Sequence, residues 1–224
     1  MEAKKATFVC VGLLVSCLAN AALGSTQSQQ LFLSTMGTLR NLDPSVATVN
    51  ARILSSNRNR TSCGSAANGD GVAFYCKNDK TIYVSAKLLS TIEKGYGPSA
   101  VRYLAAHELA HGRQHSVTGF SKNLVWSSVI DELQADCIAG AYLRLAYGYT
   151  PESPQGDAVR QFAYNIGDHE YLSHDWHGNP RWRVAAVSRG MRTGSPARCL
   201  SSKRFNYGSL VETGADLLRK RRQK

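Results

Sequence analysis

The residues best suited to chemistry form a pentapeptide that begins at His107 and ends at His111, with Glu108 second. The two histidines are four residues apart, so on an α-helix they lie about one turn apart on one face and both rings can reach one metal ion. Glu108 can contact a water bound to that ion and take its proton. This H-E-x-x-H spacing predicts one Zn²⁺ per chain, with Glu108 as general base. The alternative is a core helix whose histidines only form hydrogen bonds.

A zinc site of this kind needs a third ligand, and three positions can be compared. His115 continues the ridge of the two histidines, but three ligands along one straight helix spread over roughly 12 Å, too far to bind one ion. A histidine six residues beyond His111 would fall at Val117, which has no ligand atom. Glu132 lies on the next predicted helix, and its carboxylate would complete a His₂Glu site with one position open for water. We therefore predict Glu132 as the third ligand.

Asp136 follows Glu132 by about one helical turn. A carboxylate at this position can accept a hydrogen bond from the second ring nitrogen of a ligand histidine and so fix its tautomer. The apolar run 137–139 comes directly afterwards. This favours a partly buried functional role for Glu132 over a solvated surface carboxylate.

The elements that must position these residues are predicted from apolar periodicity and from turn residues. Helical spacing or a helix-starting proline marks the segments 31–42, 100–115, about 121–147, 157–165 and the residues after Pro180. Runs rich in β-branched and aromatic residues, separated by Gly, Asn and Asp, lie at 51–55, 72–76 and 81–85. We expect these runs to form a small antiparallel sheet. Short strands followed by packed helices predict an α+β fold.

The N-terminal residues 1–21 have the pattern of an export signal. Two lysines precede an uncharged, mostly apolar stretch, and the small-x-small sequence ANA at 19–21 predicts cleavage within 21–24. The apolar stretch is short for a transmembrane helix. The sequence LVSC that ends at Cys17 resembles a bacterial lipobox, so a lipoprotein anchored through Cys17 is the alternative. Apolar residues that continue past Cys17 favour soluble export.

Cysteine usage agrees with export. Beyond the signal the chain has four cysteines, Cys63, Cys76, Cys137 and Cys199. An even number in an exported protein suggests two disulfides, for which three pairings are possible. Four reduced cysteines in a cytosolic protein are the alternative. We predict a periplasmic or secreted protein that contacts the membrane only through a lipidated Cys17 or an uncleaved signal.

The 224 residues suffice for one domain with a hydrophobic core, predicted here as 25–217. The formal net charge is +11, and five basic residues lie in the C-terminal tail 218–224. A solvated tail is the favoured interpretation, and docking to nucleic acid or to an anionic membrane is the alternative. Because the sequence has no readable nucleic-acid motif, we predict no nucleic-acid partner.

The segment 132–140 reads ELQADCIAG and follows the H-E-x-x-H helix. Together they resemble the bacterial putative neutral zinc metallopeptidases, whose hallmark is close to E-L-Q-A-D-C-x-A-G. The likeness extends over about residues 60–200, most of the mature chain. Matching positions outside the two motifs include Cys63, Phe74, Cys76, Ile82, Ile166, Asp168, His177, Arg183, Arg189, Gly194 and Cys199.

The resemblance implies a gluzincin-like site in which His107, His111 and Glu132 bind zinc and Glu108 is the base. His177, which also lies in a matching segment, is a candidate donor to the oxyanion that forms during peptide hydrolysis. The histidines at positions 169 and 174 compete with it for this role. An exposed loop histidine without a role in catalysis is the alternative.

The resemblance also implies a disulfide between Cys63 and Cys76, which would close a hairpin-sized loop, and it leaves Cys137 to pair with Cys199. Two features depart from the family pattern. Gly112–Arg113 stand where members usually carry a bulkier pair, and many members begin with a longer transmembrane anchor. Substrate preference and membrane attachment therefore do not follow from the resemblance.

The sequence as a whole predicts a zinc metalloendopeptidase acting on a peptide or protein substrate in the bacterial envelope or outside the cell. A catalytically silent zinc-binding envelope protein with a chaperone or regulatory role is the alternative within the same fold. The presence of Glu108 argues against it, because a site that only binds metal needs no base. A third hypothesis is a basic module that docks through 218–224. Deletion of that tail would abolish docking and leave a peptidase active.

Overall fold

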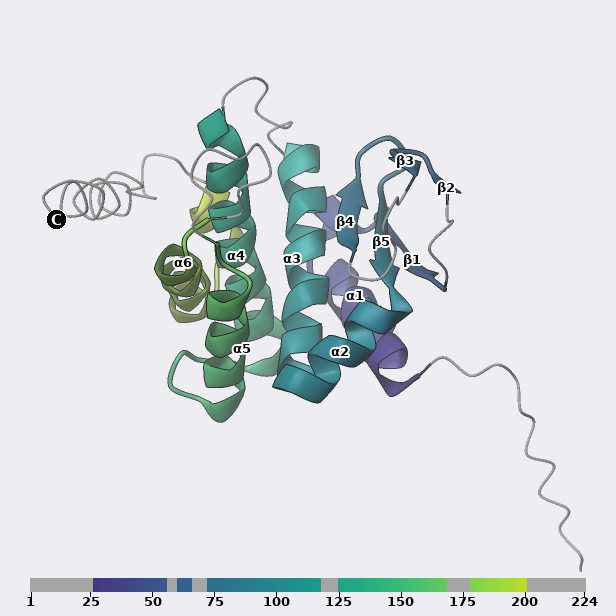
Figure 1. Cartoon of the computed structure of the whole chain (residues 1–224). Helices are drawn as coiled ribbons and strands as arrows, with labels where there is room; N and C mark the ends of the chain where they lie inside the picture. Colours follow the sequence, from purple (N-terminus) through teal and green to yellow (C-terminus); the bar gives the residue numbers. More distant parts are fainter. Residues whose placement is uncertain (1–25, 56–59, 66–71, 118–124, 169–177, 201–224) are drawn as a thin grey trace, which may run out of the picture.

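The computed structural model describes residues 26–55, 60–65, 72–117, 125–168 and 178–200. The predicted signal segment, Cys17, His177 and the tail 218–224 lie outside these residues. In the described part helices predominate, and a small sheet lies at one side of them (Figure 1). The predicted α+β fold is confirmed.

The chain enters the domain through a helix that packs on one face. Helix α1 (Gln27–Leu42) leads into the 3₁₀-helix η1 (Pro44–Val46). The buried apolar residues of α1 recur at helical spacing, at Phe32, Met36 and Leu39. Figure 1 shows α1 behind the central helices, on the side that carries the sheet.

Short strands form the rest of the N-terminal part. The described strands are β1 (Asn50–Leu54), β2 (Arg60–Thr61), β3 (Gly64–Ser65), β4 (Ala73–Cys76) and β5 (Thr81–Ser85). One sheet has the order β1-β5-β4, and β2 pairs with β3. The predicted antiparallel pairing holds for β4 and β5, but β1 runs parallel to β5, so the sheet is mixed. The Asn50 amide donates a hydrogen bond to the Lys80 carbonyl at 2.9 Å. The first residue of β1 therefore lies beside the start of β5, and the two strands are parallel.

The next two helices lead to the centre of the molecule. Helix α2 (Ala86–Tyr96) starts directly after β5, where the Ser85 hydroxyl accepts a hydrogen bond from the Leu88 amide at 3.0 Å. Gly97, with φ of 77°, ends α2, and α3 (Pro98–Val117) follows. Helix α3 is buried along most of its length and packs against α1 and β4 on one side and α4 on the other (Figure 1).

The C-terminal half consists of α4 (Val125–Tyr147), α5 (Pro154–Asn165), α6 (Pro180–Thr193) and α7 (Pro196–Leu200). Capping side chains of Ser153 and Asn179 precede α5 and α6, and each helix has proline in its first turn. The structure confirms the predicted helices and adds α2 and α7, which periodicity did not indicate.

Helices α4 and α6 approach each other closely. A Cβ added at Gly140 of α4 would lie 2.2 Å from the carbonyl oxygen of Val187, and one added at Gly190 of α6 would lie 1.9 Å from that of Cys137. Only glycine fits at such distances, because a side chain would collide with backbone. The two glycines therefore determine which side chains of α6 meet α4.

Two disulfides are present among the described residues. Cys63 is bonded to Cys76 at the edge of the sheet, and Cys137 of α4 is bonded to Cys199 of α7. These are the pairs that the sequence led us to expect. Disulfides persist in oxidising compartments and are rare in the cytosol.

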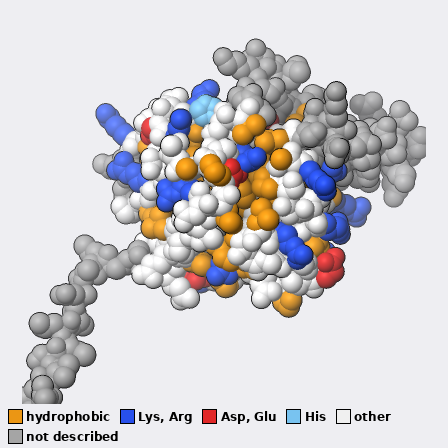
Figure 2. Space-filling view, turned by 180° about the vertical axis from the view of Figure 1, so that it is seen from behind, with side chains coloured by type: hydrophobic (Ala, Val, Ile, Leu, Met, Phe, Trp, Pro, Cys, Tyr) orange, Lys and Arg blue, Asp and Glu red, His pale blue; other side chains and the backbone are white. Residues whose placement is uncertain are grey.

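The described surface combines basic and apolar side chains. Figure 2 shows Lys and Arg side chains spread over the face opposite to that of Figure 1, with apolar side chains exposed between them. This face is positively charged without a single basic stripe. Among the described helices, none is both long enough and apolar enough to cross a membrane.

Candidate metal centre

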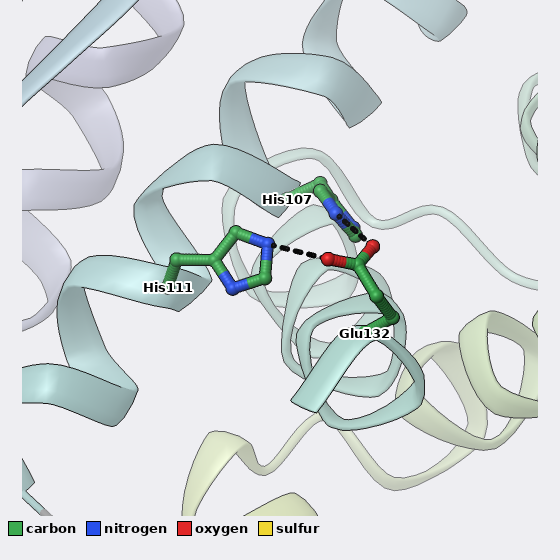
Figure 3. Close-up of side chains that lie close together, drawn as sticks. All are labelled: His107, His111 and Glu132. Carbon is green, nitrogen blue, oxygen red and sulfur yellow. Dashed lines mark ion pairs between the residues drawn. The ribbon is translucent and has the colours of Figure 1, made fainter. Parts of the chain in front are cut away.

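Two neighbouring helices bring three potential ligand side chains together (Figure 3). His107 and His111 lie one turn apart on α3, and the Glu132 carboxylate reaches them from α4. Glu132 Oε2 is 3.2 Å from His107 Nε2, and Glu132 Oε1 is 3.3 Å from His111 Nε2. The ligand atoms all lie within 4.8 Å of one another. The packing of α3 on α4 therefore assembles the three predicted ligands at one point.

This arrangement fits a zinc ion. Tetrahedral zinc with ligands at about 2.0–2.2 Å places neighbouring ligand atoms about 3.3–3.6 Å apart. The distances from the Glu132 carboxylate to the two imidazoles are close to that spacing. Two imidazole nitrogens and one carboxylate oxygen are also the donor set of zinc sites that keep a fourth position for water. Within the part of the chain that the structure describes, these residues are the group that could hold a metal ion.

Asp136 orients the first histidine. Its Oδ1 atom is 2.9 Å from Nδ1 of His107, and its side chain is completely buried. The hydroxyl of Tyr103 donates a hydrogen bond to the same Oδ1. When the ring is neutral, a carboxylate this close favours the proton on Nδ1, which leaves the lone pair on Nε2, the nitrogen that faces Glu132. The position of Asp136 is therefore the one that the sequence predicted. Tyr103 was not singled out, although it lies four residues before His107 and on the same helix face.

Gln114 orients the second histidine. Its Oε1 atom is 2.9 Å from Nδ1 of His111, so the ring has its Nδ1 proton toward the amide oxygen and its Nε2 lone pair toward Glu132. The Gln114 amide nitrogen donates to the carbonyl oxygen of Asp131 at 2.7 Å, which fixes the amide orientation across the α3–α4 interface. Sequence reasoning missed Gln114. Its spacing of three residues from His111 was the available signal.

The charges of the cluster favour a cation between the three side chains. Burial opposes a charge on His107, but the nearby carboxylates of Asp136 and Glu132 outweigh burial and raise its pKa to about 10. Burial also opposes the charge of Glu132, but His111 and His107 outweigh it and hold the pKa of Glu132 well below its usual range. A metal ion competes with protons for the imidazole lone pairs. The negative groups that favour protons here would also favour a bound dication.

Glu108 lies beside this cluster on the same helix. It directly follows His107 and is 5% exposed. Burial lowers the pKa of His111, but the charge of Glu132 and, to a smaller extent, that of Glu108 outweigh burial and raise it. A carboxylate in this place can exchange a proton with a water next to the imidazoles.

The other histidines considered from the sequence have different positions. Nδ1 of His115 is 2.9 Å from the hydroxyl of Tyr75 on β4, and His115 is not part of the ligand cluster. His177 lies outside the described residues. Its neighbour Gly178 is described, and a Cβ there would lie 3.6 Å from Leu133 and 3.7 Å from Arg183. The chain therefore re-enters the described structure beside the helix that carries Glu132.

This α+β fold thus joins two histidines of an H-E-x-x-H helix and a glutamate of the next helix into one His₂Glu group that could hold a metal ion. Residues 44–202 match the family described as "putative neutral zinc metallopeptidase", and the chain belongs to this family.

Relatives of the chain occur in Escherichia coli and in mycobacteria. "Uncharacterized protein YpfJ" of Escherichia coli strain K12 is 27% identical over 164 residues, which cover 62% of this chain and 57% of the relative. "Uncharacterized protein Rv2575" of Mycobacterium tuberculosis strain H37Rv is 34% identical over 169 residues, with the same coverages of 62% and 57%. The chain thus spans less than two thirds of the length of these relatives. No solved structure is significantly similar to it.

Proposed function

We propose that the protein is a zinc-dependent peptidase in which His107, His111 and Glu132 hold one Zn²⁺ and Glu108 is the general base. One observation carries this proposal: two helices converge so that three ligand atoms lie within 4.8 Å of one another, next to a buried carboxylate. The distances between the carboxylate and the imidazoles suit a tetrahedral ion.

Several residues have separate roles in the proposed hydrolysis. Zinc, when bound, acidifies a water molecule and polarises the carbonyl of the scissile bond. Glu108 takes the proton of the attacking water on a carboxylate oxygen and returns it to the nitrogen of the leaving amine. Asp136 and Gln114 keep the ring protons of the two histidines on Nδ1, so that both Nε2 atoms stay available as ligands.

We further propose His177 as the donor that stabilises the oxyanion of the tetrahedral intermediate. Its neighbour Gly178 lies against Leu133 and Arg183, and the Arg183 guanidinium is 3.7 Å from the Glu132 carboxylate. A preorganised donor contributes mainly in the transition state, so His177→Ala should lower kcat by about 100- to 1000-fold. Its zinc content should stay that of the parent. An unchanged kcat would remove His177 from the mechanism.

The Glu108→Gln variant tests the proposed function. Glutamine keeps the size of the side chain but cannot accept a proton from water, so the variant should fold and bind zinc like the parent and lose peptide hydrolysis by several orders of magnitude. Cleavage sites mapped by mass spectrometry with parent and variant in parallel would identify the substrate. If the zinc-loaded parent cleaves no peptide, a zinc-binding protein with a chaperone or regulatory role becomes the better explanation.

We also propose that the protein is exported to the periplasm or secreted. Support comes from the two disulfides and from the signal pattern in residues 1–21. Mass spectrometry of the N-terminus of the protein isolated from its host would distinguish cleavage within 21–24 from a lipidated Cys17. An intact Met1 on a protein recovered from the cytosol would contradict export.

A further inference from the structure

Arg183 places a buried positive charge next to the metal cluster. It lies in the first part of α6 and is 2% exposed. Its Nε atom donates to Oδ2 of Asp136 at 2.9 Å, and its Nη2 atom donates to Oδ1 at 2.9 Å. A guanidinium that binds both oxygens of one carboxylate fixes the plane as well as the position of that carboxylate.

Arg183 is connected to two of the three ligands. The Asp136 oxygen that receives Nη2 is also the one that lies 2.9 Å from His107 Nδ1. The same Nη2 atom lies 3.7 Å from Oε2 of Glu132, the oxygen that faces His107. One guanidinium nitrogen thus sits between the carboxylate that orients a ligand ring and the carboxylate that is itself a ligand.

This geometry differs from that of an ordinary buried ion pair between helices. A pair that only stabilised the contact of α4 with α6 would need no connection to the ligands. Asp136 has no exposure to solvent, so its orientation depends on its protein partners, which among the described residues include Arg183, Tyr103 and His107. Of these, Arg183 alone binds both carboxylate oxygens. It is therefore the partner that determines the plane of the group facing His107.

Building on the function proposed above, we propose that Arg183 is a positioning residue of the metal centre. It holds Asp136 in the orientation that fixes the His107 ring, and its charge keeps the Glu132 carboxylate directed toward the two histidines. A lysine at this place would keep the charge but lose the two-pronged hydrogen bond. The effect of Arg183 on zinc binding should therefore not be reproduced by lysine.

The test compares Arg183→Lys and Arg183→Gln with Arg181→Lys, a matched control at an exposed position of the same helix. The dissociation constant for zinc is measured by competition with a chromophoric chelator on purified, folded protein. The absorption spectrum of the Co²⁺-loaded form reports ligand geometry independently of activity. Thermal unfolding curves of the metal-free variants show whether each variant is folded. If Arg183→Gln does not fold, the comparison of Arg183→Lys with the parent decides the test.

We expect Arg183→Lys to bind zinc about 10-fold more weakly, within the range for residues that orient ligands, and to change the Co²⁺ spectrum. Arg181→Lys should match the parent in both measurements. In an Asp136→Asn background the further loss caused by Arg183→Lys should shrink, since the residue acts mainly through Asp136.

A folded Arg183→Lys variant with the zinc affinity and Co²⁺ spectrum of the parent would overturn the inference. So would equal losses in the parent and Asp136→Asn backgrounds. Failure of the parent itself to bind zinc would instead overturn the proposed function, and the positioning role would fall with it.

Discussion

At the scale of single residues, the metal centre consists of ligands and of the side chains that hold them. His107 and His111 each present Nε2 to Glu132, and each has its Nδ1 atom beside an acceptor, Asp136 or Gln114. Such partners hold the orientation of both rings, and they keep the Nδ1 proton in place when a metal displaces the proton on Nε2.

The ligand assignment predicts how single substitutions change zinc content. His111→Ala and Glu132→Ala should each lose most of the zinc, because two remaining ligands bind it weakly. His115→Ala is the matched control and should keep about one zinc per chain, since its ring pairs with Tyr75 instead. Elemental analysis after dialysis measures the content. Full zinc retention by Glu132→Ala would refute the third ligand.

At the scale of elements, the centre depends on how α3, α4 and α6 pack. The ligands come from α3 and α4, whereas Arg183 comes from α6. The short distance between α4 and α6 is possible because Gly140 and Gly190 face backbone atoms of the opposite helix. A change in this packing would move the guanidinium relative to both carboxylates.

Gly190→Ala should therefore destabilise the protein. Its Cβ would lie 1.9 Å from the Cys137 carbonyl oxygen, so the helices must separate, at a cost of about 2–3 kcal/mol. Gly37→Ala in α1 is the control, because a Cβ there meets nothing within 4 Å, and it should be neutral or stabilising by up to about 1 kcal/mol. Urea unfolding measures both free energies. Equal stabilities of the two variants would contradict the close-packing argument.

Asp43 connects the N-terminal elements to the same helices. Arg113 of α3 donates to its Oδ2 atom, and the Tyr142 hydroxyl of α4 donates to the same atom at 2.7 Å. Burial raises the pKa of Asp43, but hydrogen bonds from Ser45 and Tyr142 and the charge of Arg113 outweigh burial and lower the pKa below 3.8. Folding therefore favours the ionised form of the Asp43 carboxyl group.

This shift predicts a pH dependence of stability. Because the folded-state pKa lies below that of the unfolded chain, the contribution of Asp43 is present above the unfolded pKa and is lost as the pH falls through the folded one. Between about pH 6 and about pH 3 the parent should lose more unfolding free energy than Asp43→Asn does. Denaturant titrations at several pH values measure this difference. Parallel losses in both proteins would show that Asp43 contributes nothing to acid sensitivity.

At the scale of the whole molecule, two disulfides close loops of different length. Cys63 and Cys76 are 13 residues apart, and Cys137 and Cys199 are 62 residues apart. The longer bridge attaches the C-terminal α7 to the helix that carries Glu132 and Asp136. Loss of the Cys137–Cys199 bridge should therefore disturb the metal centre more than loss of the Cys63–Cys76 bridge.

Loop-closure entropy predicts the relative costs. Replacing Cys137 and Cys199 by alanine should destabilise the protein by about 4 kcal/mol, and replacing Cys63 and Cys76 by about 3 kcal/mol. Thermal and urea unfolding of the two double variants measures which variant loses more free energy of unfolding. Non-reducing peptide mapping of the parent establishes that the pairs are those of the structure. A larger loss from the Cys63–Cys76 pair would contradict the entropic argument.

The sequence by itself determined the features that depend on local spacing. A spacing of four residues, about one helical turn, places His107 and His111 on one face. The ELQADC segment supplied both the family resemblance and the candidates Glu132 and Asp136. Pro180 marked the start of the last predicted helix, and β-branched and aromatic runs marked the strands of the sheet.

Only the tertiary structure decided the contacts between residues far apart in the chain. It brought Arg183 to Asp136 across 47 positions, joined Gln114 to the Asp131 carbonyl, and set β1 parallel to β5. Periodicity predicts which face of an element is buried, but the partner of that face depends on how whole helices and strands pack. For Arg183 this depends on a close approach of α4 and α6 that no local pattern encodes.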